Sequence, residues 1–469
     1  MKPPRSVLLG MIWLILSPTL VRAESSLCRT DLDRQIEALR HPRDRWGVLV
    51  ETLSPPRLLY RRNADRYFIP ASNVKLLTTA AALSQLGANF RVRTAAYATE
   101  NGLHVVGRGD PSLSTEQLAS LARQVREAGI ERVNQLIGDD TYFRGAIVHP
   151  NWEWEDVQAG YGAPVNSLIA NRNAIALKVI PQQLGQPLRL DWLDPREALR
   201  VRVDNRTIAV AAEQPEFLQL DRSLARSSIQ LHGQLVVGSK PAEIAIAVPD
   251  PAQHFLRQFR HRLEQAGVTV GRVEVGSDPK DILREPVAVV FSPPLGELVG
   301  DTNRLSDNLY AEVLLRWLGV NREQERQSTV AAGLEQLQQT LSDLGVEPES
   351  YQLADGSGLS RQNLVSPAAI VQTLRGMANS PHAEIYRDSL PLGGESGTLR
   401  SRFRNSPVRG RVRAKTGTLT GVSALSGYLT MGDRSLIFSI LINHSPESAT
   451  DQRQAIDRIV TQLTRLRDC

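Results

Sequence analysis

The two ends of the chain share a pattern that the middle lacks, and this contrast limits the possible folds more than any other feature. Near the N-terminus, residues 46–59 (WGVLVETLSPPRLL) are typical of a strand, a turn and a second strand, and a helix is predicted from Ser72 to about Gly87. After about Pro286 strong helical patterns return, followed by strands joined by a tight turn at 431–434. Both ends therefore favour α/β structure.

The middle of the chain instead alternates short strands and turns, with predicted helices at Thr115–Gly129 and Gln253–Gly267. At 469 residues, two or three domains are expected. The simplest interpretation is one α/β unit split by a large insertion, because chain ends that lie close together tolerate insertions. We predict that 24–93 and 287–469 form the split domain, with 94–173 and 249–286 as one inserted domain and 174–248 as a second domain nested in it.

The first 23 residues have the pattern of a signal peptide. Lys2 and Arg5 precede the apolar run Val7–Leu16, and Ala23 is a small residue at the expected cleavage site. An uncleaved N-terminal anchor is the alternative, and no later segment approaches the length of a membrane span. We expect an exported protein in a periplasmic or other extracytoplasmic compartment, with peripheral membrane association at most.

The only two cysteines, Cys28 and Cys469, lie at opposite ends of the chain. Each is next to a segment with an amphipathic helical pattern. If these helices pack antiparallel, the two thiols come together, and an exported compartment permits a disulfide. Two free thiols remain the alternative, because disulfide geometry is demanding.

Composition argues against several classes of function. The formal charge of +5 is spread along the chain without a basic block, which disfavours a nucleic-acid partner. The eight histidines show no metal-ligand spacing, and no nucleotide-binding glycine loop is present. We therefore expect neither a metal nor a cofactor.

One short segment, residues 70–83 (PASNVKLLTTAAAL), carries a serine three residues before a lysine. On a helix, Ser72 and Lys75 lie on one face and can touch. Small and apolar neighbours on every side predict a buried helix, and burial favours a neutral amine that can act as a general base. Arginine cannot do this, and the chain contains six lysines against forty-nine arginines.

Two further motifs give this weak pattern its meaning. Ser306-Asp307-Asn308 precedes a predicted helix, and Lys415-Thr416-Gly417-Thr418 lies in a predicted strand. Ser-x-x-Lys, Ser-Asp-Asn and Lys-Thr-Gly, in this order, mark the penicillin-binding serine acyl-transferases. Separately, the second motif could be a helix cap and the third a strand with a glycine kink.

The residue types fit acyl transfer. We expect Ser72 to be the nucleophile and Lys75 its base, while Ser306 relays a proton to the leaving amine. Asn308 holds the substrate peptide, and the charge of Lys415 keeps Lys75 inclined to the neutral form.

The Lys-Thr-Gly strand supplies the expected substrate contacts. Thr416 and Thr418 would bind a terminal carboxylate, and Gly417 would let an extended substrate approach. The backbone N–H groups of Ser72 and Thr418 would form the oxyanion hole.

Over nearly its whole length after the signal segment, the chain resembles the low-molecular-mass class C penicillin-binding proteins, the D-alanyl-D-alanine carboxypeptidase/endopeptidase family S13. Besides the three motifs, the resemblance rests on GRGDPSL (107–113), GDDTYF (138–143), PNWEWEDVQAGYGAP (150–164), SPPLGEL (292–298) and DGSGLSR (355–361). It implies an α/β (α+β) serine β-lactamase/transpeptidase-like domain with a central antiparallel sheet and helices, interrupted by two smaller β-rich domains.

The resemblance also implies a pocket for a side chain of the substrate, formed by Asp156, Tyr161 and Arg361. An Asp–Arg pair could hold the amine and carboxylate of a residue such as diaminopimelate. The segment 355–361 could instead be purely a structural turn. Trp152 and Trp154 fit packing better than substrate stacking.

From these observations we expect a D-Ala-D-Ala carboxypeptidase that acts on peptidoglycan stem peptides and is inhibited by β-lactams. A D,D-endopeptidase activity is a second candidate activity of the same site. A β-lactamase with the same nucleophile and a catalytically silent peptidoglycan-binding protein are the alternatives.

Overall fold

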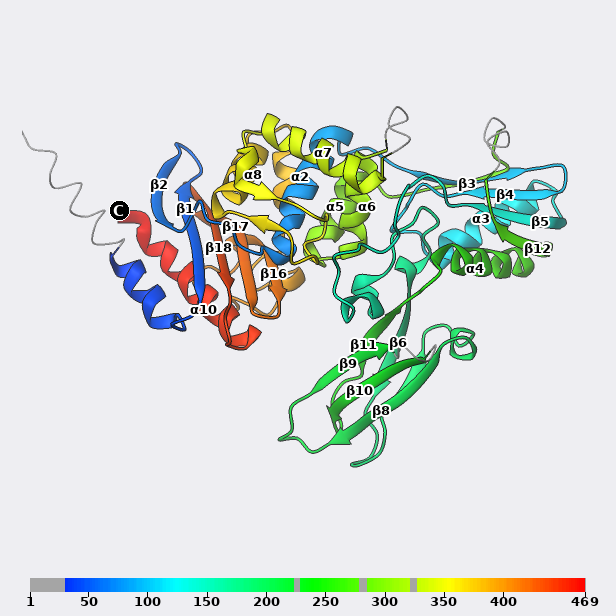
Figure 1. Cartoon of the computed structure of the whole chain (residues 1–469), viewed down its shortest axis with the longest axis horizontal. Coiled ribbons are helices and arrows are strands. Elements are labelled where there is room, and N and C mark those ends of the chain that lie inside the picture. The colour runs from blue at the N-terminus through cyan, green and yellow to red at the C-terminus, as the bar shows by residue number, and fades with distance from the viewer. Residues whose placement is uncertain (1–29, 223–227, 278–284, 321–326, 469) are drawn as a thin grey trace, which may run out of the picture.

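The computed structural model describes residues 30–222, 228–277, 285–320 and 327–468. The predicted signal peptide and both cysteines lie outside these residues. Figure 1 shows three parts: a sheet with helices around it, a second sheet at the far end of the long axis, and a strand-rich unit projecting from between them.

Both ends of the chain build one five-stranded sheet, in the order β16-β17-β18-β1-β2. Every neighbouring pair is antiparallel. The strands are β1 (Arg45–Thr52), β2 (Arg57–Arg62), β16 (Val412–Leu419), β17 (Val422–Met431) and β18 (Arg434–Asn443). The expected turn at 431–434 is confirmed, because Met431 and Arg434 pair across it. So is the predicted mixed α/β fold with a central antiparallel sheet.

Helices cover both faces of this sheet. One face packs with a cluster of helices around the buried α2 in a continuous apolar core: α2 (Val74–Leu86), α5 (Leu295–Arg304), α6 (Asn308–Leu318), α7 (Thr329–Asp343), α8 (Pro367–Ala378) and α9 (Ala383–Asp388). All residues from Val74 to Leu83 are buried, as the small and apolar sequence predicted. A two-stranded ribbon, β14 (Tyr351–Gln352) and β15 (Leu364–Val365), flanks the cluster.

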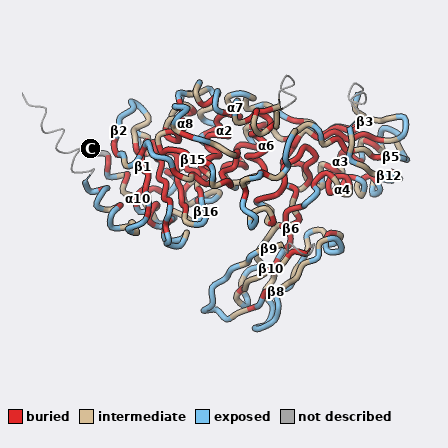
Figure 2. The backbone as a smooth tube through the Cα atoms, viewed as in Figure 1, coloured by how far each residue is buried: buried red, intermediate tan, exposed pale blue. Residues whose placement is uncertain are grey.

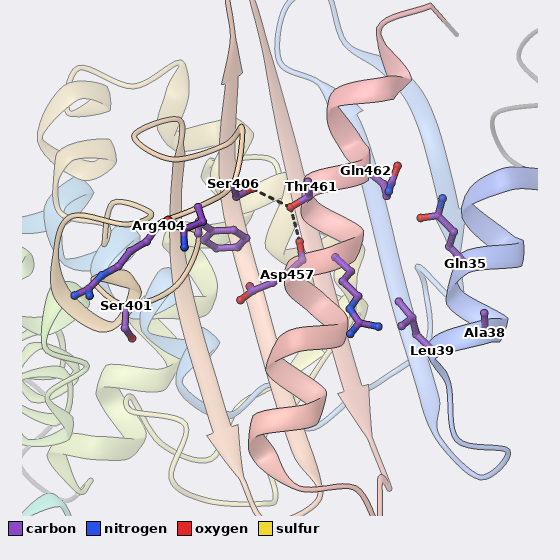
Figure 3. A pocket seen from close by; sticks show the side chains of 12 residues that line it. Gln35, Ala38, Leu39, Ser401, Arg404, Ser406, Asp457, Thr461 and Gln462 are labelled. Carbon is purple, nitrogen blue, oxygen red and sulfur yellow. Dashed lines mark hydrogen bonds between the residues drawn. The ribbon is translucent and has the colours of Figure 1, made fainter.

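The other face of the sheet packs against the helix at 30–39 and α10 (Ala449–Gln462). These helices run antiparallel: Gln35 and Gln462 line one cavity between them, and His41 and Asp451 line the next. The first of these cavities has a volume of about 690 Å³ (Figure 3), where Thr461 Oγ1 donates to the Asp457 carbonyl at 2.8 Å. The packing that the cysteine hypothesis required is present.

The second sheet has the order β12-β5-β4-β3-β13 and its own core with two helices. Its elements are β3 (Arg93–Ala98), β4 (Gly102–Val106), α3 (Thr115–Glu127), β5 (Arg132–Asp139), α4 (Pro251–Gln265), β12 (Thr269–Val275) and β13 (Ala288–Phe291). Because β13 pairs with β3, this sheet extends past residue 286, the predicted end of the insertion.

The strand-rich unit contains two three-stranded sheets, β8-β10-β9 and β11-β6-β7. Its strands are β6 (Ala174–Ile180), β7 (Arg189–Trp192), β8 (Arg202–Val210), β9 (Phe217–Arg222), β10 (Ser228–Val236) and β11 (Ala242–Ala247). We call it the nested unit. Its core is small, and most of its residues are exposed or half-buried (Figure 2). The separate cores support the predicted division into domains, which stays a prediction.

No helix among the described residues is long and apolar enough to cross a membrane.

Candidate active site

The predicted serine and lysine lie together where the chain enters α2. Ser72 belongs to a 3₁₀ turn, Ala71–Asn73, and Lys75 follows in the first turn of the helix. The Lys75 Nζ atom lies 3.0 Å from Ser72 Oγ, 2.6 Å from Asn308 Oδ1 and 2.6 Å from the carbonyl oxygen of Ser357. Lys75 therefore joins the nucleophile candidate to the second motif.

Burial is the main influence on the protonation of Lys75. The side chain is 0% exposed, and desolvation lowers its pKa from 10.5 to about 8, against the opposing effect of Asp355, Asp307 and Glu312. Burial is the cause that the apolar neighbours of Lys75 predicted, and the expected contribution of the Lys415 charge stays a prediction. Burial first, and then the charge of Lys75, lower the pKa of Lys415 well below its usual value.

The second and third motifs meet through Lys415 and Ser306. Lys415 Nζ donates to Ser306 Oγ at 2.7 Å and to the Thr416 carbonyl at 2.9 Å. Ser306 has a left-handed backbone (φ 59°), which is uncommon for a residue with a side chain and recurs at functional sites. Asp307 caps α6 by accepting from the Tyr310 N–H, so the segment is both a helix cap and part of the site.

Gly417 is needed for packing within the protein. A Cβ atom at this position would lie 2.8 Å from the Pro70 carbonyl oxygen and 3.1 Å from Asn73 Nδ2. Asn73 Nδ2 also donates to the Lys415 carbonyl at 3.2 Å. The missing side chain thus lets edge strand β16 close against the Ser72 turn, a reason that the sequence analysis did not give.

The two threonines of the third motif point to different partners. Thr418 lines a cavity of about 660 Å³ together with Ser72, Ser306 and Asn308. Thr416 Oγ1 donates instead to Thr398 Oγ1 at 2.8 Å. Of the two threonines expected to bind the substrate carboxylate, Thr418 lines this cavity and Thr416 is not among its lining residues.

The same cavity is also lined by the residues of the expected side-chain pocket, Asp156, Tyr161 and Arg361. Tyr161 donates its hydroxyl to Asp156 Oδ1 at 3.0 Å. Arg361 pairs with Glu153 at 3.0 Å and donates to the Thr420 carbonyl at 3.1 Å. The three residues of the expected pocket therefore line one cavity, and Glu153 is an additional carboxylate beside Arg361.

The segment that carries Trp152 and Tyr161 also contacts Asn308 of the second motif and the 355–361 turn. Asn308 Nδ2 donates to the Tyr161 carbonyl at 2.9 Å, and Trp152 Nε1 donates to Asp355 Oδ2 at 3.0 Å. Trp152 is buried, whereas Trp154 is 49% exposed. The favoured interpretation of the pair, a packing role, therefore fits Trp152 and not the exposed Trp154.

A model of the D-Ala-D-Ala carboxypeptidase 3 (S13) family matches residues 28–463. The chain belongs to this family. Among curated relatives it is 35% identical to a D-alanyl-D-alanine carboxypeptidase of Actinomadura sp. (strain R39), over 96% of this chain and 88% of that protein. It is 31% identical to penicillin-sensitive carboxypeptidase A of Dictyostelium discoideum, over 90% and 87% of the two chains.

Solved structures agree on the fold of this S13 chain. Penicillin-binding protein 4 (dacB) from Haemophilus influenzae superposes with a TM-score of 0.77 at 24% identity, covering 92% of this chain and 99% of that one. The predatory peptidoglycan endopeptidase Bd3459 from Bdellovibrio bacteriovorus superposes with a TM-score of 0.53 at 15% identity, covering 89% and 92%.

In this S13 chain, one buried carboxylate that supports Lys75 through Ser357 was not predicted from the sequence. Glu312 lies one helical turn after Asn308 on α6 and is fully buried. Its Oε1 accepts the N–H groups of Gly356 and Ser357, both at 3.0 Å, and the Ser357 carbonyl in turn binds Lys75. The spacing of four residues from Asn308 was the available signal.

Two more buried groups complete this support. Arg316 Nη1 lies 3.0 Å from Glu312 Oε2, one further turn along α6. Asp355 accepts the N–H groups of Gly358 and Ser360, both at 2.7 Å. The turn at 355–361 is therefore structural, as one interpretation held, and its Ser357 carbonyl also accepts a hydrogen bond from Lys75.

Proposed function

We propose that the chain is a serine-type D-Ala-D-Ala carboxypeptidase acting on peptidoglycan stem peptides through an acyl-enzyme on Ser72. The single observation that carries this is the bonding of the buried Lys75 amine to both Ser72 Oγ and Asn308 Oδ1. Membership of the S13 family and the carboxypeptidase names of its relatives support the same reaction.

In the first step, Ser72 Oγ attacks the carbonyl carbon between the two D-alanines and Lys75 Nζ takes its proton. A lysine with a pKa of about 8 holds a useful fraction of neutral amine near pH 7. The backbone N–H groups of Ser72 and Thr418 stabilise the resulting oxyanion, a contribution of about 3 kcal/mol per donor in comparable sites.

In the second step, the C–N bond breaks and the leaving D-alanine takes a proton through Ser306, which is hydrogen-bonded to Lys415. Asn308 holds the peptide group of the substrate, and Thr418 binds the terminal carboxylate. Water then hydrolyses the acyl-Ser72 ester, with Lys75 as its base, and restores the free serine. A D-Ala–diaminopimelate cross-link has the same D-alanyl acyl group, so the same chemistry gives endopeptidase activity.

Penicillins acylate Ser72 in this account, because a strained β-lactam amide presents its carbonyl to the same nucleophile. The substrate places the protein on the extracytoplasmic side of the membrane, in contact with peptidoglycan. Asp156, Tyr161 and Arg361 hold the side chain of the third stem residue.

The test is release of D-alanine from a synthetic stem pentapeptide by the purified protein. We expect release by the wild type and none above background by Ser72→Ala. Equal release by both would contradict the assignment. Rapid turnover of penicillin without a lasting adduct would favour the β-lactamase alternative, and an unchanged cell-wall phenotype with Ser72→Ala would favour the silent binding protein.

A further inference from the structure

The side-chain pocket does not close behind the residues that line it. A second cavity of about 790 Å³ adjoins the catalytic one, and both are lined by the same five residues: Glu153, Asp156, Tyr161, Arg361 and Thr420. These residues form a shared wall with a compartment on each side. The second volume lies within the range of roughly 300–1,000 Å³ that is typical of ligand pockets.

The far side of this second compartment is built by the nested unit. Leu218–Leu220 of β9 and Glu243–Ala245 of β11 line it. Both strands stand at the edges of their three-stranded sheets, and among the described residues the strand partner of β9 is β10 alone. An edge strand offers free backbone N–H and C=O groups, which can bind an extended peptide as an added strand.

The edge of β11 is partly occupied already. Ala159 forms a single bridge with Ile246, next to the segment that lines the compartment. The longer free edge is therefore that of β9, and we assign the main-chain contacts of a bound peptide to β9.

The charges of the compartment are mainly negative. Glu153, Glu155, Asp156 and Glu243 line it, against the single cation Arg361, which is paired with Glu153. Outside the lining, Lys178 Nζ lies 4.0 Å from Glu243. None of the ion pairs found among the described residues includes Glu155 or Asp156. A ligand with a free amine suits this surface.

The position of the shared wall identifies the occupant. A free side chain of the third stem residue ends at Asp156 and Arg361. In cross-linked peptidoglycan, the amine of that side chain instead carries a second stem peptide, which continues past the wall. That second stem is an extended chain, and its own third residue has a free amine.

We propose that the compartment between β9 and β11 binds the second stem peptide of a cross-linked substrate, attached through the side chain of the third residue. This inference rests on the proposed carboxypeptidase function, since it extends the same substrate. It gives the nested unit a role in selecting cross-linked over single stems.

The experiment compares D-alanine release from two substrates. One is a single-stem pentapeptide, and the other is the same pentapeptide with its third-residue amine acylated by a tetrapeptide stem. The readout is the ratio of kcat/KM for the cross-linked substrate to kcat/KM for the single stem. Chromatography separates released D-alanine from any cleavage of the cross-link itself.

Glu243→Arg reverses a charge in the compartment, and we expect it to lower the ratio about fivefold, which corresponds to the loss of one strong exposed charge contact. Gln219→Arg, on β9, is a second variant and should lower the ratio as well. Glu213→Arg is the matched control, because this exposed residue of the nested unit does not line the cavity. It should keep the wild-type ratio.

A wild-type ratio in both Glu243→Arg and Gln219→Arg would overturn the inference while leaving the proposed function intact. An equal fall in Glu213→Arg would also overturn it, because the effect would then come from general charge. Failure of the wild type to release D-alanine from the single stem would overturn the proposed function, and the inference with it.

Discussion

Two parts of the candidate active-site cleft are built in opposite ways: the floor, around Lys75 and Lys415, and the wall, lined by Glu153, Asp156, Tyr161, Arg361 and Thr420. On the floor, Lys75 and Lys415 are both 0% exposed, and the structure gives each amine protein oxygens within 3.0 Å. On the wall, Tyr161 is 54% exposed, and the Arg361–Glu153 pair is open to water. Buried polar groups have no substitute partners, whereas water replaces and screens exposed ones.

The contrast predicts where the loss of a side-chain group has a large effect on activity or stability. Loss of one group on the floor should remove activity or stability almost completely, and loss of one on the wall should change substrate preference by a modest factor. The predictions below test that difference, in order of decreasing effect.

The largest effect is expected for Lys75→Arg, which keeps a positive charge and removes the amine that can accept a proton. Acylation by a penicillin or a pentapeptide should fall about 10³-fold, within the usual range for loss of a general base. Lys178→Arg, at an exposed lysine, is the control and should retain wild-type rates. Stopped-flow acylation rates measure both, and a Lys75→Arg variant within tenfold of the wild type would rule out the base role.

The next largest effect is expected for the buried ion pair of Glu312 and Arg316, which supports the floor. Arg316→Met leaves the Glu312 carboxylate buried without its partner, at an expected cost of about 3–5 kcal/mol in the free energy of unfolding. Burial already raises the pKa of Glu312.

The matched control for this change is Arg260→Met, which breaks the exposed pair with Glu264 at the same i,i+4 spacing on α4. It should cost less than about 1 kcal/mol. Urea denaturation compares the two variants, and equal losses would contradict the contrast between buried and exposed groups.

The pH dependence follows from the lowered pKa of Lys75, at about 8. The neutral amine is the active form, so its fraction falls below this pH and rises above it. Penicillin acylation should therefore increase about tenfold between pH 7 and pH 9 and level off above that. A profile that is flat over this range, or that falls, would show that another group limits the reaction.

The smallest effect is expected on the wall. Arg361→Ala should lower kcat/KM about fivefold for pentapeptides with a charged third side chain, because the contact is exposed. Pentapeptides with an aliphatic side chain at that position should react at the wild-type rate. Equal losses for both kinds of substrate would mean that Arg361 supports the cleft as a whole.

The floor could be predicted from the sequence because its chemistry permits few residue types. An amine that can lose its proton, three residues after a serine, indicated Ser72 and Lys75, and a further scarce lysine in the third motif indicated Lys415. The fold brings these residues to Ser306 and Asn308. The motifs could not show that Gly417 packs against Pro70, because that contact joins residues far apart in the sequence.

The supporting groups were harder to predict for the same reason. Glu312 and Arg316 lie in a segment with a strong helical pattern, and only contact with the 355–361 turn gives Glu312 its backbone partners. Likewise, the sequence did not single out Glu153, because its ion pair with Arg361 depends on how two distant segments meet. Local sequence patterns do not specify contacts between segments that only the tertiary fold brings together.

The most direct test of the central claim is to find which residue a penicillin modifies. The purified protein is incubated with benzylpenicillin, and its intact mass and proteolytic peptides are determined by mass spectrometry. We predict a single adduct on Ser72, absent from Ser72→Ala. An adduct on another residue of the folded wild type, or an unchanged adduct in Ser72→Ala, would contradict the account.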